Sequence, residues 1–547
     1  MLLGRHTARD IALLAVGASL YTIAAPPYEW SSAGWLALFP LFLVLRDKTP
    51  GTAYAAGFLY GVFFCSGIAY WVYYAIAAYF ALSLPLNLFV TFLSYSFFVG
   101  SYTGLAAAGS CVLMRNRRPV LRWVGIPALW VSAEFARTSW FAGFSWELLG
   151  YTQYRQLPLI QMADMTGVYG LSFLLALSGY VSAEAWASLS VFPSSLPRTA
   201  RPQRFPWPAL GSLLGGIVLA LCYGTLRLHQ YDSPAGSSLK LALVEGNIPT
   251  AQRWQRVHYA TTLLQYIAVT RQGVTGGPLD LVVWPEFAIG FYLDREPVLE
   301  AQLGQLTRGL DAALLLGAPR MEETAVGSHY YNSAYLLGPS GALQGTYDKM
   351  RLLPFAEYNP LPFLPVHGRA QETPSTFTPG REPTILRLPQ AAFGVTICYE
   401  ATYPDLSRRL VRHGAQFLVN ISNDTWLVKD GGAAAAQHFS MTVLRAVENK
   451  RPLVRATTAG VSGFVDPTGR SHHLSTRAGE VILGEIVPRS ELTVYARYGD
   501  WFAFGCVGVA LVALWAGRLG KGLSFFSGNE TQAIHEELRS VAVRHSS

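Results

Sequence analysis

Three residues in the second half of the sequence, Glu286, Lys349 and Cys398, have side chains that together could carry out acyl transfer. An ionised cysteine is a strong nucleophile, and a nearby lysine lowers the pKa of its thiol. Glu286 could take the thiol proton, and later return it to a leaving group or remove one from an incoming amine. Lys349, helped by the backbone N–H of Tyr399, could stabilise the oxyanion of a tetrahedral intermediate.

Each of these residues follows a run that is typical of a β-strand. Glu286 follows Leu-Asp-Leu-Val-Val-Trp-Pro, in which Pro285 ends the strand, and Cys398 follows Phe-Gly-Val-Thr-Ile. Lys349 lies just beyond the second strand of a predicted hairpin. Reactive groups at strand ends are the usual arrangement of an α/β active site. Taken singly, the three residues have plainer explanations: a core cysteine, a glutamate near a helix start and a surface lysine.

Residues 238–495 alternate strand-like runs with helical ones, which predicts an α/β sandwich whose sheets are covered by helices. Helical patterns cover Tyr259–Thr270 and Pro297–Thr307. Two strand-like runs flank Gly-Pro-Ser-Gly, which is a hairpin signal. The predicted strands are Leu239–Val244, Leu279–Trp284, Ala312–Ala318, Tyr330–Leu337, Leu343–Tyr347, Thr396–Ile397, Phe417–Ile421, Phe464–Val465 and Glu480–Val487.

The chain as a whole is too apolar for an ordinary soluble enzyme. Hydrophobic residues make up 51% of the sequence and charged residues only 14%, which indicates membrane spans. The second and fifth of the predicted spans are short, and either could be re-entrant or interfacial. Eight spans are predicted near 10–26, 34–45, 53–79, 84–114, 121–136, 167–190, 208–228 and 501–517.

Positive charges alternate between successive loops and predict the orientation of the chain. Arginine and lysine residues precede span one and follow spans two, four, six and eight. The opposite loops carry almost none, apart from Arg137 and Arg155. We therefore expect a multi-pass protein of the bacterial inner membrane with a membrane domain at 1–228, a periplasmic domain at 238–495 and an eighth span at 501–517. Both termini, including the polar tail at 519–547, are expected in the cytoplasm.

The formal net charge of +8 is explained by these loops and does not indicate nucleic-acid binding. Of the five cysteines, only Cys398 falls in the predicted soluble domain, so no disulfide framework is expected. No Cys/His spacing suggests zinc, and no nucleotide motif is present. The expected chemistry therefore needs no cofactor and no metal.

The three reactive residues resemble the catalytic triad of the nitrilase superfamily, in which Glu, Lys and Cys occur in this chain order. Trp-Pro-Glu286, Tyr-Asp-Lys349 and Ile-Cys398-Tyr-Glu match its signatures. Within that superfamily the chain looks like the apolipoprotein N-acyltransferases, because seven spans precede the triad. Further matching segments are Glu134 with Arg137, Gly143–Trp146, Leu149–Gln153, Ala163–Gly170, Gly246–Pro249 with Gln252 and Trp254, Leu353–Tyr358, Ile421–Trp426 and Gln437–Phe439.

The resemblance implies a nitrilase-like αββα sandwich and a ping-pong reaction. Cys398 would form a thioester with an acyl chain of a phospholipid such as phosphatidylethanolamine, and the α-amine of a diacylglyceryl apolipoprotein would then accept that chain. The implied protein is a monomer in contact with membrane lipid. Supporting residues would be Glu357, which would hold Lys349, together with Tyr399 and Glu400. Trp254 and Trp146 would contact lipid or steer loops, with an interfacial aromatic belt as the alternative for Trp146.

The segment after Asp424 departs from the family pattern. Leu427-Val428 follows Trp426 where Phe-Gly is usual, and Ala433–Ala436 replaces a Gly-Pro before the Gln-His pair. We expect this region to form a mobile lid. Two alternatives stay open from the sequence: a membrane-tethered amidase that uses water as acceptor, and a catalytically silent lipoprotein-binding paralogue.

Overall fold

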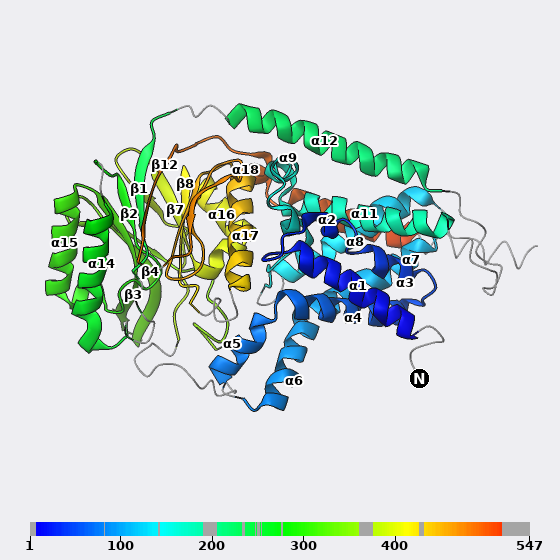
Figure 1. The fold of residues 1–547 in the computed structure, drawn as a ribbon, viewed down its shortest axis with the longest axis horizontal. Helices are drawn as coiled ribbons and strands as arrows, with labels where there is room; N and C mark the ends of the chain where they lie inside the picture. Colours follow the sequence, from blue (N-terminus) through cyan, green and yellow to red (C-terminus); the bar gives the residue numbers. More distant parts are fainter. Residues whose placement is uncertain are drawn as a thin grey trace, which may run out of the picture.

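The computed structural model has a helical half and an α/β half that lie side by side along the long axis of the molecule (Figure 1). The predicted tail at 519–547 lies outside the described residues. The structure describes residues 7–516 except 81, 117, 140–142, 190–204, 232–235, 247, 249–251, 253, 275–276, 326, 360–375, 426–431 and 478.

The α/β half contains two six-stranded sheets, of order β12-β1-β2-β3-β4-β5 and β11-β10-β9-β8-β7-β6. The central strands β1 to β3 are parallel to one another, as are β7 to β9. The strands are β1 (Leu239–Val244), β2 (Leu281–Val283), β3 (Ala313–Thr324), β4 (Gly327–Leu337), β5 (Leu343–Asp348), β6 (Ile385–Arg387), β7 (Ala392–Ile397), β8 (Phe417–Ser422), β9 (Leu453–Thr457), β10 (Ser462–Val465), β11 (Ser471–Ser475) and β12 (Val481–Ile486).

The alternation of side chains along β1 explains the layering. Leu241 and Leu243 face the second sheet and pack in one core with residues such as Phe393. Ala242 and Val244 point the other way, into a second core beneath the covering helices. Because successive residues of a strand point to opposite faces, a strand that is apolar throughout must be covered on both sides.

Helices α14 (Tyr259–Gly273) and α15 (Pro297–Leu310) cover the first sheet, and α16 (Pro404–Arg412) and α17 (Ala433–Asn449) cover the second. The layers therefore run helix, sheet, sheet, helix, with α16 and α17 next to the helical half (Figure 1). The predicted α/β sandwich is confirmed. Strands β6, β9 and β11 were not predicted.

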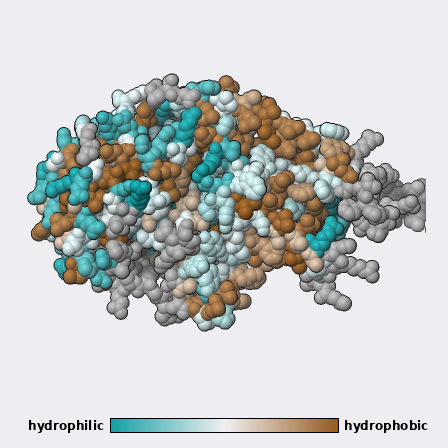
Figure 2. All heavy atoms as spheres, viewed as in Figure 1, coloured by the Kyte–Doolittle hydropathy of each residue, from teal (hydrophilic) through white to brown (hydrophobic). Residues whose placement is uncertain are grey.

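Five segments of the helical half are long and apolar enough to cross a membrane: α1, α4, residues 84–114, α11 and α12. Figure 2 shows hydrophobic side chains gathered along α12. The helices are α1 (Thr7–Ala24), α2 (Ser31–Gly34), α3 (Phe39–Leu45), α4 (Pro50–Ile68), α5 (Trp71–Phe80), α6 (Leu84–Tyr95), α7 (Ser101–Met114), α8 (Pro119–Ser139), α9 (Leu157–Ile160), α10 (Ala163–Thr166), α11 (Val168–Leu189), α12 (Trp207–Tyr231), α18 (Val494–Tyr498) and the short apolar helix Trp501–Ala516.

Two of the predicted spans differ from the structure. The predicted run at 53–79 is two helices, because α4 ends at Ile68 and α5 starts at Trp71. The backbone carbonyls at this break accept hydrogen bonds from distant side chains, since Gln437 donates to Ile68 and Tyr95 donates to Ala69. At the fifth predicted span the helix α8 has 21 residues, more than the predicted run at 121–136, but α8 is not among the five segments that are apolar enough to cross a membrane. The total of eight spans stays a prediction.

Candidate active site

The structure brings the three predicted reactive residues to the ends of three strands. Glu286 follows β2 after Trp284 and Pro285, and Lys349 directly follows β5. Cys398 follows β7 and begins a 3₁₀ turn that ends at Thr402. Their exposed fractions are 3%, 1% and 4%. All three side chains are thus withdrawn from water between the two sheets, where charges interact strongly.

Lys349 lies between two carboxylates. Its Nζ donates to Oε1 of Glu286 at 3.3 Å and to Oε1 of Glu357 at 2.9 Å. The amide of Asn332 donates to the same two oxygens, at 2.7 and 2.8 Å. The backbone N–H of Asn423 donates to the other oxygen of Glu286 at 2.8 Å. These contacts fix the Glu286 carboxylate and the ammonium group in one geometry.

Burial raises the pKa of Glu286, and the negative charge of Glu357 raises it further against the opposing effect of Lys349. Burial alone would lower the pKa of Lys349, but Glu286 and Glu357 outweigh burial and raise it well above its ordinary value. Lys349 is therefore charged throughout the physiological range. Glu286 has the raised pKa that suits a group which must both accept and return a proton.

Cys398 has two unusual features. Its φ is +53°, in the left-handed region that residues with a side chain seldom adopt. Burial and the charge of Glu286 raise the pKa of its thiol, although Lys349 acts in the opposite direction. Lys349 thus lowers the thiol pKa as expected from the sequence, but burial and Glu286 outweigh it, so the net shift in the resting protein is upward. The Cys398 thiol is protonated at neutral pH and needs a base.

This raised thiol pKa predicts how Cys398 reacts with iodoacetamide. The rate of alkylation should be low at pH 7 and rise steadily up to pH 9, because the thiolate is the reactive form and its fraction grows with pH below the pKa. Mass spectrometry of the Cys398 peptide gives the rate, and the same peptide in unfolded protein is the control with an ordinary thiol pKa. A rate that is already constant between pH 6 and pH 8 would contradict the raised pKa.

Glu400 joins the segments that carry Lys349 and Cys398. Its carboxylate accepts hydrogen bonds from the backbone N–H groups of Ile397 at 2.7 Å, Met350 at 2.6 Å and Arg351 at 2.9 Å. Burial raises its pKa to about 7, although these backbone donors favour the charged form. One buried carboxyl group thus sets the spacing between the end of β5 and the end of β7.

The three predicted tryptophans have different surroundings. Trp146 is 1% exposed, and its ring lies against Trp71 and Tyr399, with centroid distances of 4.7 and 6.4 Å. The aromatic-belt interpretation of Trp146 is therefore wrong, because a belt residue must reach the membrane surface. Trp254 is half-buried with its ring 4.9 Å from that of Phe287, which is next to Glu286. Trp426 lies outside the described residues.

The predicted lid is only partly described. Leu427 and Val428 lie outside the described residues, as Trp426 does. Ala433–Ala436 is not a lid loop, because it forms the first turn of α17 and its first three residues are buried. Alanine is a strong helix former, so this run continues the helix toward the site.

Sequence reasoning gave no role to several buried polar residues around the three reactive groups. Asn332 bridges Glu286 and Glu357 from within β4, where nothing in the strand pattern sets it apart. Asp424 and His438 were noted only as parts of matching motifs, and both are at most 1% exposed. Arg455 is also fully buried and donates to Asp424 at 2.6 Å.

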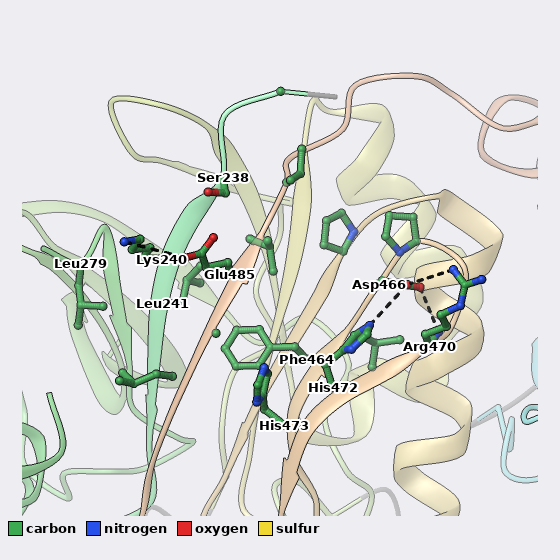
Figure 3. A pocket seen from close by; sticks show the side chains of 18 of the residues that line it. Ser238, Lys240, Leu241, Leu279, Phe464, Asp466, Arg470, His472, His473 and Glu485 are labelled. Carbon is green, nitrogen blue, oxygen red and sulfur yellow. Dashed lines mark hydrogen bonds and ion pairs between the residues drawn. The ribbon is translucent and has the colours of Figure 1, made fainter. Parts of the chain in front are cut away.

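A large cavity lies away from these residues. It has a volume of about 980 Å³ and lies between β1, β12 and the β10–β11 hairpin (Figure 3). Four of its charged residues form ion pairs, Lys240 with Glu485 and Asp466 with Arg470. None of the three reactive residues lines it. We therefore locate the candidate active site by its side chains and not by cavity volume.

The double sheet, with Glu, Lys and Cys at its strand ends, defines an α/β domain of the carbon-nitrogen hydrolase class, here joined to membrane helices. The carbon-nitrogen hydrolase family model matches residues 240–492, and the model of the apolipoprotein N-acyltransferase N-terminal domain matches residues 17–181. The chain belongs to the apolipoprotein N-acyltransferase family.

Curated relatives of similar length carry this assignment. The chain is 37% identical over 516 residues to an apolipoprotein N-acyltransferase of Geobacter metallireducens, with 93% of this chain and 96% of the relative covered. It is 34% identical over 521 residues to one of Azotobacter vinelandii, with 93% and 94% covered. A solved amidase of the nitrilase superfamily from Nesterenkonia shares 20% identity over 48% of this chain and 95% of its own, with a TM-score of 0.36.

Proposed function

We propose that this protein N-acylates the diacylglyceryl-cysteine at the N-terminus of apolipoproteins, with a membrane phospholipid as acyl donor and a thioester on Cys398 as intermediate. The observation that carries the proposal is the location of the buried Glu286–Lys349–Cys398 group beside the membrane helices. The hydroxyl of Tyr403 donates to the carbonyl of Gly143 at 2.8 Å, and Ser145 donates to Thr402 at 2.8 Å. These contacts support a site that lies against the residues following helix α8, where a membrane phospholipid would be the acyl donor.

The first half-reaction transfers the acyl chain to sulfur. Glu286 takes the thiol proton as Cys398 attacks the ester carbonyl carbon at the sn-1 position of phosphatidylethanolamine. Lys349 and the backbone N–H of Tyr399 stabilise the oxyanion that forms. The ester C–O bond then breaks, and Glu286 returns its proton to the departing oxygen. The products are a thioester and a lysophospholipid.

The second half-reaction transfers the chain to nitrogen. The neutral α-amine of the lipoprotein attacks the thioester carbonyl, and Lys349 again faces the oxyanion. Glu286 removes a proton from the nitrogen, the C–S bond breaks, and the proton returns to the sulfur. An amide and the free Cys398 thiol result, so the enzyme is ready for another cycle.

The proposed location is the bacterial inner membrane, with the α/β half on the periplasmic side. The five long apolar helices support a multi-pass membrane protein. The alternation of loop charges supports cytoplasmic termini. In this orientation the acceptor's amine would approach from the periplasm and the phospholipid from the outer leaflet. We propose that the protein acts as a monomer.

The test is to trap the thioester. Purified protein is incubated with phosphatidylethanolamine of one chain length, quenched in acid and digested, and the Cys398 peptide is weighed by mass spectrometry. We expect the mass of that acyl chain on the peptide, its loss with hydroxylamine, and its transfer to a diacylglyceryl peptide. Cys398→Ala is the matched control. Ammonia release from simple amides without any adduct would favour an amidase instead, and no adduct and no turnover would favour a silent paralogue.

A further inference from the structure

The backbone of Cys398 is held by a polar network behind the active site. Its carbonyl oxygen accepts a hydrogen bond from Nε2 of His438 on α17 at 3.1 Å and a longer one from Asn420 at 3.5 Å. His438 is 1% exposed. The carbonyl that His438 holds belongs to the residue whose φ is +53°. A left-handed conformation at a residue with a side chain persists only where its surroundings impose it.

The neighbours of His438 determine which of its nitrogens carries the proton. Two groups face Nδ1: a guanidinium nitrogen of Arg455 at 3.0 Å, which can only donate, and Oδ1 of Asp424 at 3.3 Å, which can only accept. The Cys398 carbonyl on the other side of the ring can only accept and requires a hydrogen on Nε2, so in the neutral ring Nδ1 is bare and accepts from Arg455, the shorter of its two contacts. Nε2 then carries the hydrogen and donates to the Cys398 carbonyl. Burial and the charge of Arg455 lower the pKa of His438, which favours this neutral form. Asp424 balances the charge of Arg455, with an oxygen 2.6 Å from the guanidinium.

Gln437, the preceding residue of α17, anchors the helix to the membrane half. Its amide donates to the carbonyls of Pro26 and Ile68, both at 3.0 Å. Its oxygen accepts from the Trp146 indole at 2.8 Å, and the Trp146 ring lies over His438 at 5.8 Å. Adjacent residues of one helix thus hold the ends of two membrane helices and the carbonyl of the reactive cysteine. The imidazole is fixed from two sides.

We propose that His438 is a positioning residue, whose Nε2–H holds the Cys398 carbonyl and so keeps the sulfur aimed at the acyl carbon between Glu286 and Lys349. The inference rests on the proposed role of Cys398 as nucleophile. His438 does not touch the substrate. It acts through the backbone, so its loss should slow the attack by sulfur without weakening phospholipid binding.

Two amide substitutions separate this role from simple packing. In His438→Gln the side-chain amide reaches as far as Nε2 and can still donate to the carbonyl, whereas in His438→Asn it reaches only as far as Nδ1. We expect thioester formation to slow about tenfold or more in His438→Asn, which is the change expected for one lost hydrogen bond. In His438→Gln the rate should stay within about threefold of wild type. The KM for phosphatidylethanolamine should not change in either variant.

Ser440→Ala is the matched control, because it removes another buried hydrogen bond of α17, from Ser440 to Glu147 at 2.9 Å, away from Cys398. It should leave the rate of thioester formation unchanged. If wild type forms the thioester, then an equal loss of rate in the Gln and Asn variants, or a raised KM for phosphatidylethanolamine, would overturn the proposal. Absence of the wild-type thioester would instead refute the proposed function.

A measurement on the wild-type protein covers the case in which the Asn variant does not fold. Nitrogen-15 NMR of histidine-labelled protein, with the His438 signals assigned by their loss in His438→Gln, reports the tautomer. We expect a protonated Nε2 and an unprotonated Nδ1. An unprotonated Nε2 at pH 7 would overturn the proposal, because it could not donate to the Cys398 carbonyl.

Discussion

Replacement of Glu286 by Gln is expected to slow thioester formation by about 10²–10⁴-fold, which is the usual contribution of a positioned general base. The thiol of Cys398 is protonated at neutral pH because burial and Glu286 raise its pKa. An amide cannot take that proton. The substitution costs one hydrogen bond, since the Gln oxygen can still accept from Lys349 and Asn332, whereas the backbone N–H of Asn423 then faces the amide nitrogen and loses its acceptor.

The pH dependence separates loss of the base from other causes of a low rate. In wild type the rate of acylation should rise with pH through the raised pKa of Glu286 and then level off, because the carboxylate is the active form. In Glu286→Gln the residual rate should keep rising into the alkaline range as the thiol itself ionises. Rapid-quench measurement of the acylated Cys398 peptide gives both profiles.

Glu485→Gln is the control for the Glu286 substitution. Glu485 lies on β12 with a side chain that is 56% exposed and pairs only loosely with Lys240, at 3.9 Å. This variant should acylate at the wild-type rate and with the wild-type pH profile. A near-normal rate in Glu286→Gln would remove Glu286 from the mechanism and leave the thiol without an identified base.

The reactive residues could be found from the sequence because the strands that carry them are locally encoded. Leu239–Val244 is predicted and observed with the same bounds, and Pro285 ends the strand before Glu286. Strand β9 was missed because its central residue, Arg455, breaks the apolar pattern. This arginine is buried only because Asp424 pairs with it from a distant part of the chain.

The misassigned features share a physical cause, which is that they depend on long-range contacts. The break between α4 and α5 has only Gly67 beside it as a local signal, and distant side chains satisfy its carbonyls. Hydropathy could not distinguish a buried Trp146 from one at the membrane surface. The thiol pKa of Cys398 depends on how burial, Glu286 and Lys349 balance, and only the folded geometry sets that balance.

Replacement of Lys349 by Met is expected both to abolish turnover and to destabilise the protein. Removal of one oxyanion donor costs about 10²–10³-fold in rate. Removal of the ammonium also leaves the carboxyl groups of Glu286 and Glu357 buried and facing each other, with Asn332 between them. A broken buried ion pair costs roughly 3–5 kcal/mol, which lowers the melting temperature of a domain of this size by about 10 °C.

A second substitution separates the two roles of Lys349. In the double variant Lys349→Met/Glu357→Gln one of the two facing carboxylates is removed, so their repulsion is abolished. The melting temperature, measured by thermal unfolding in detergent, should therefore recover most of the decrease seen in Lys349→Met. The rate of thioester formation should stay as low as in the single variant, because no cation faces the oxyanion. If acylation instead returned together with stability, the ammonium group would be needed only to neutralise Glu286 and Glu357 in the folded protein, and the oxyanion would have to be stabilised by backbone N–H groups alone.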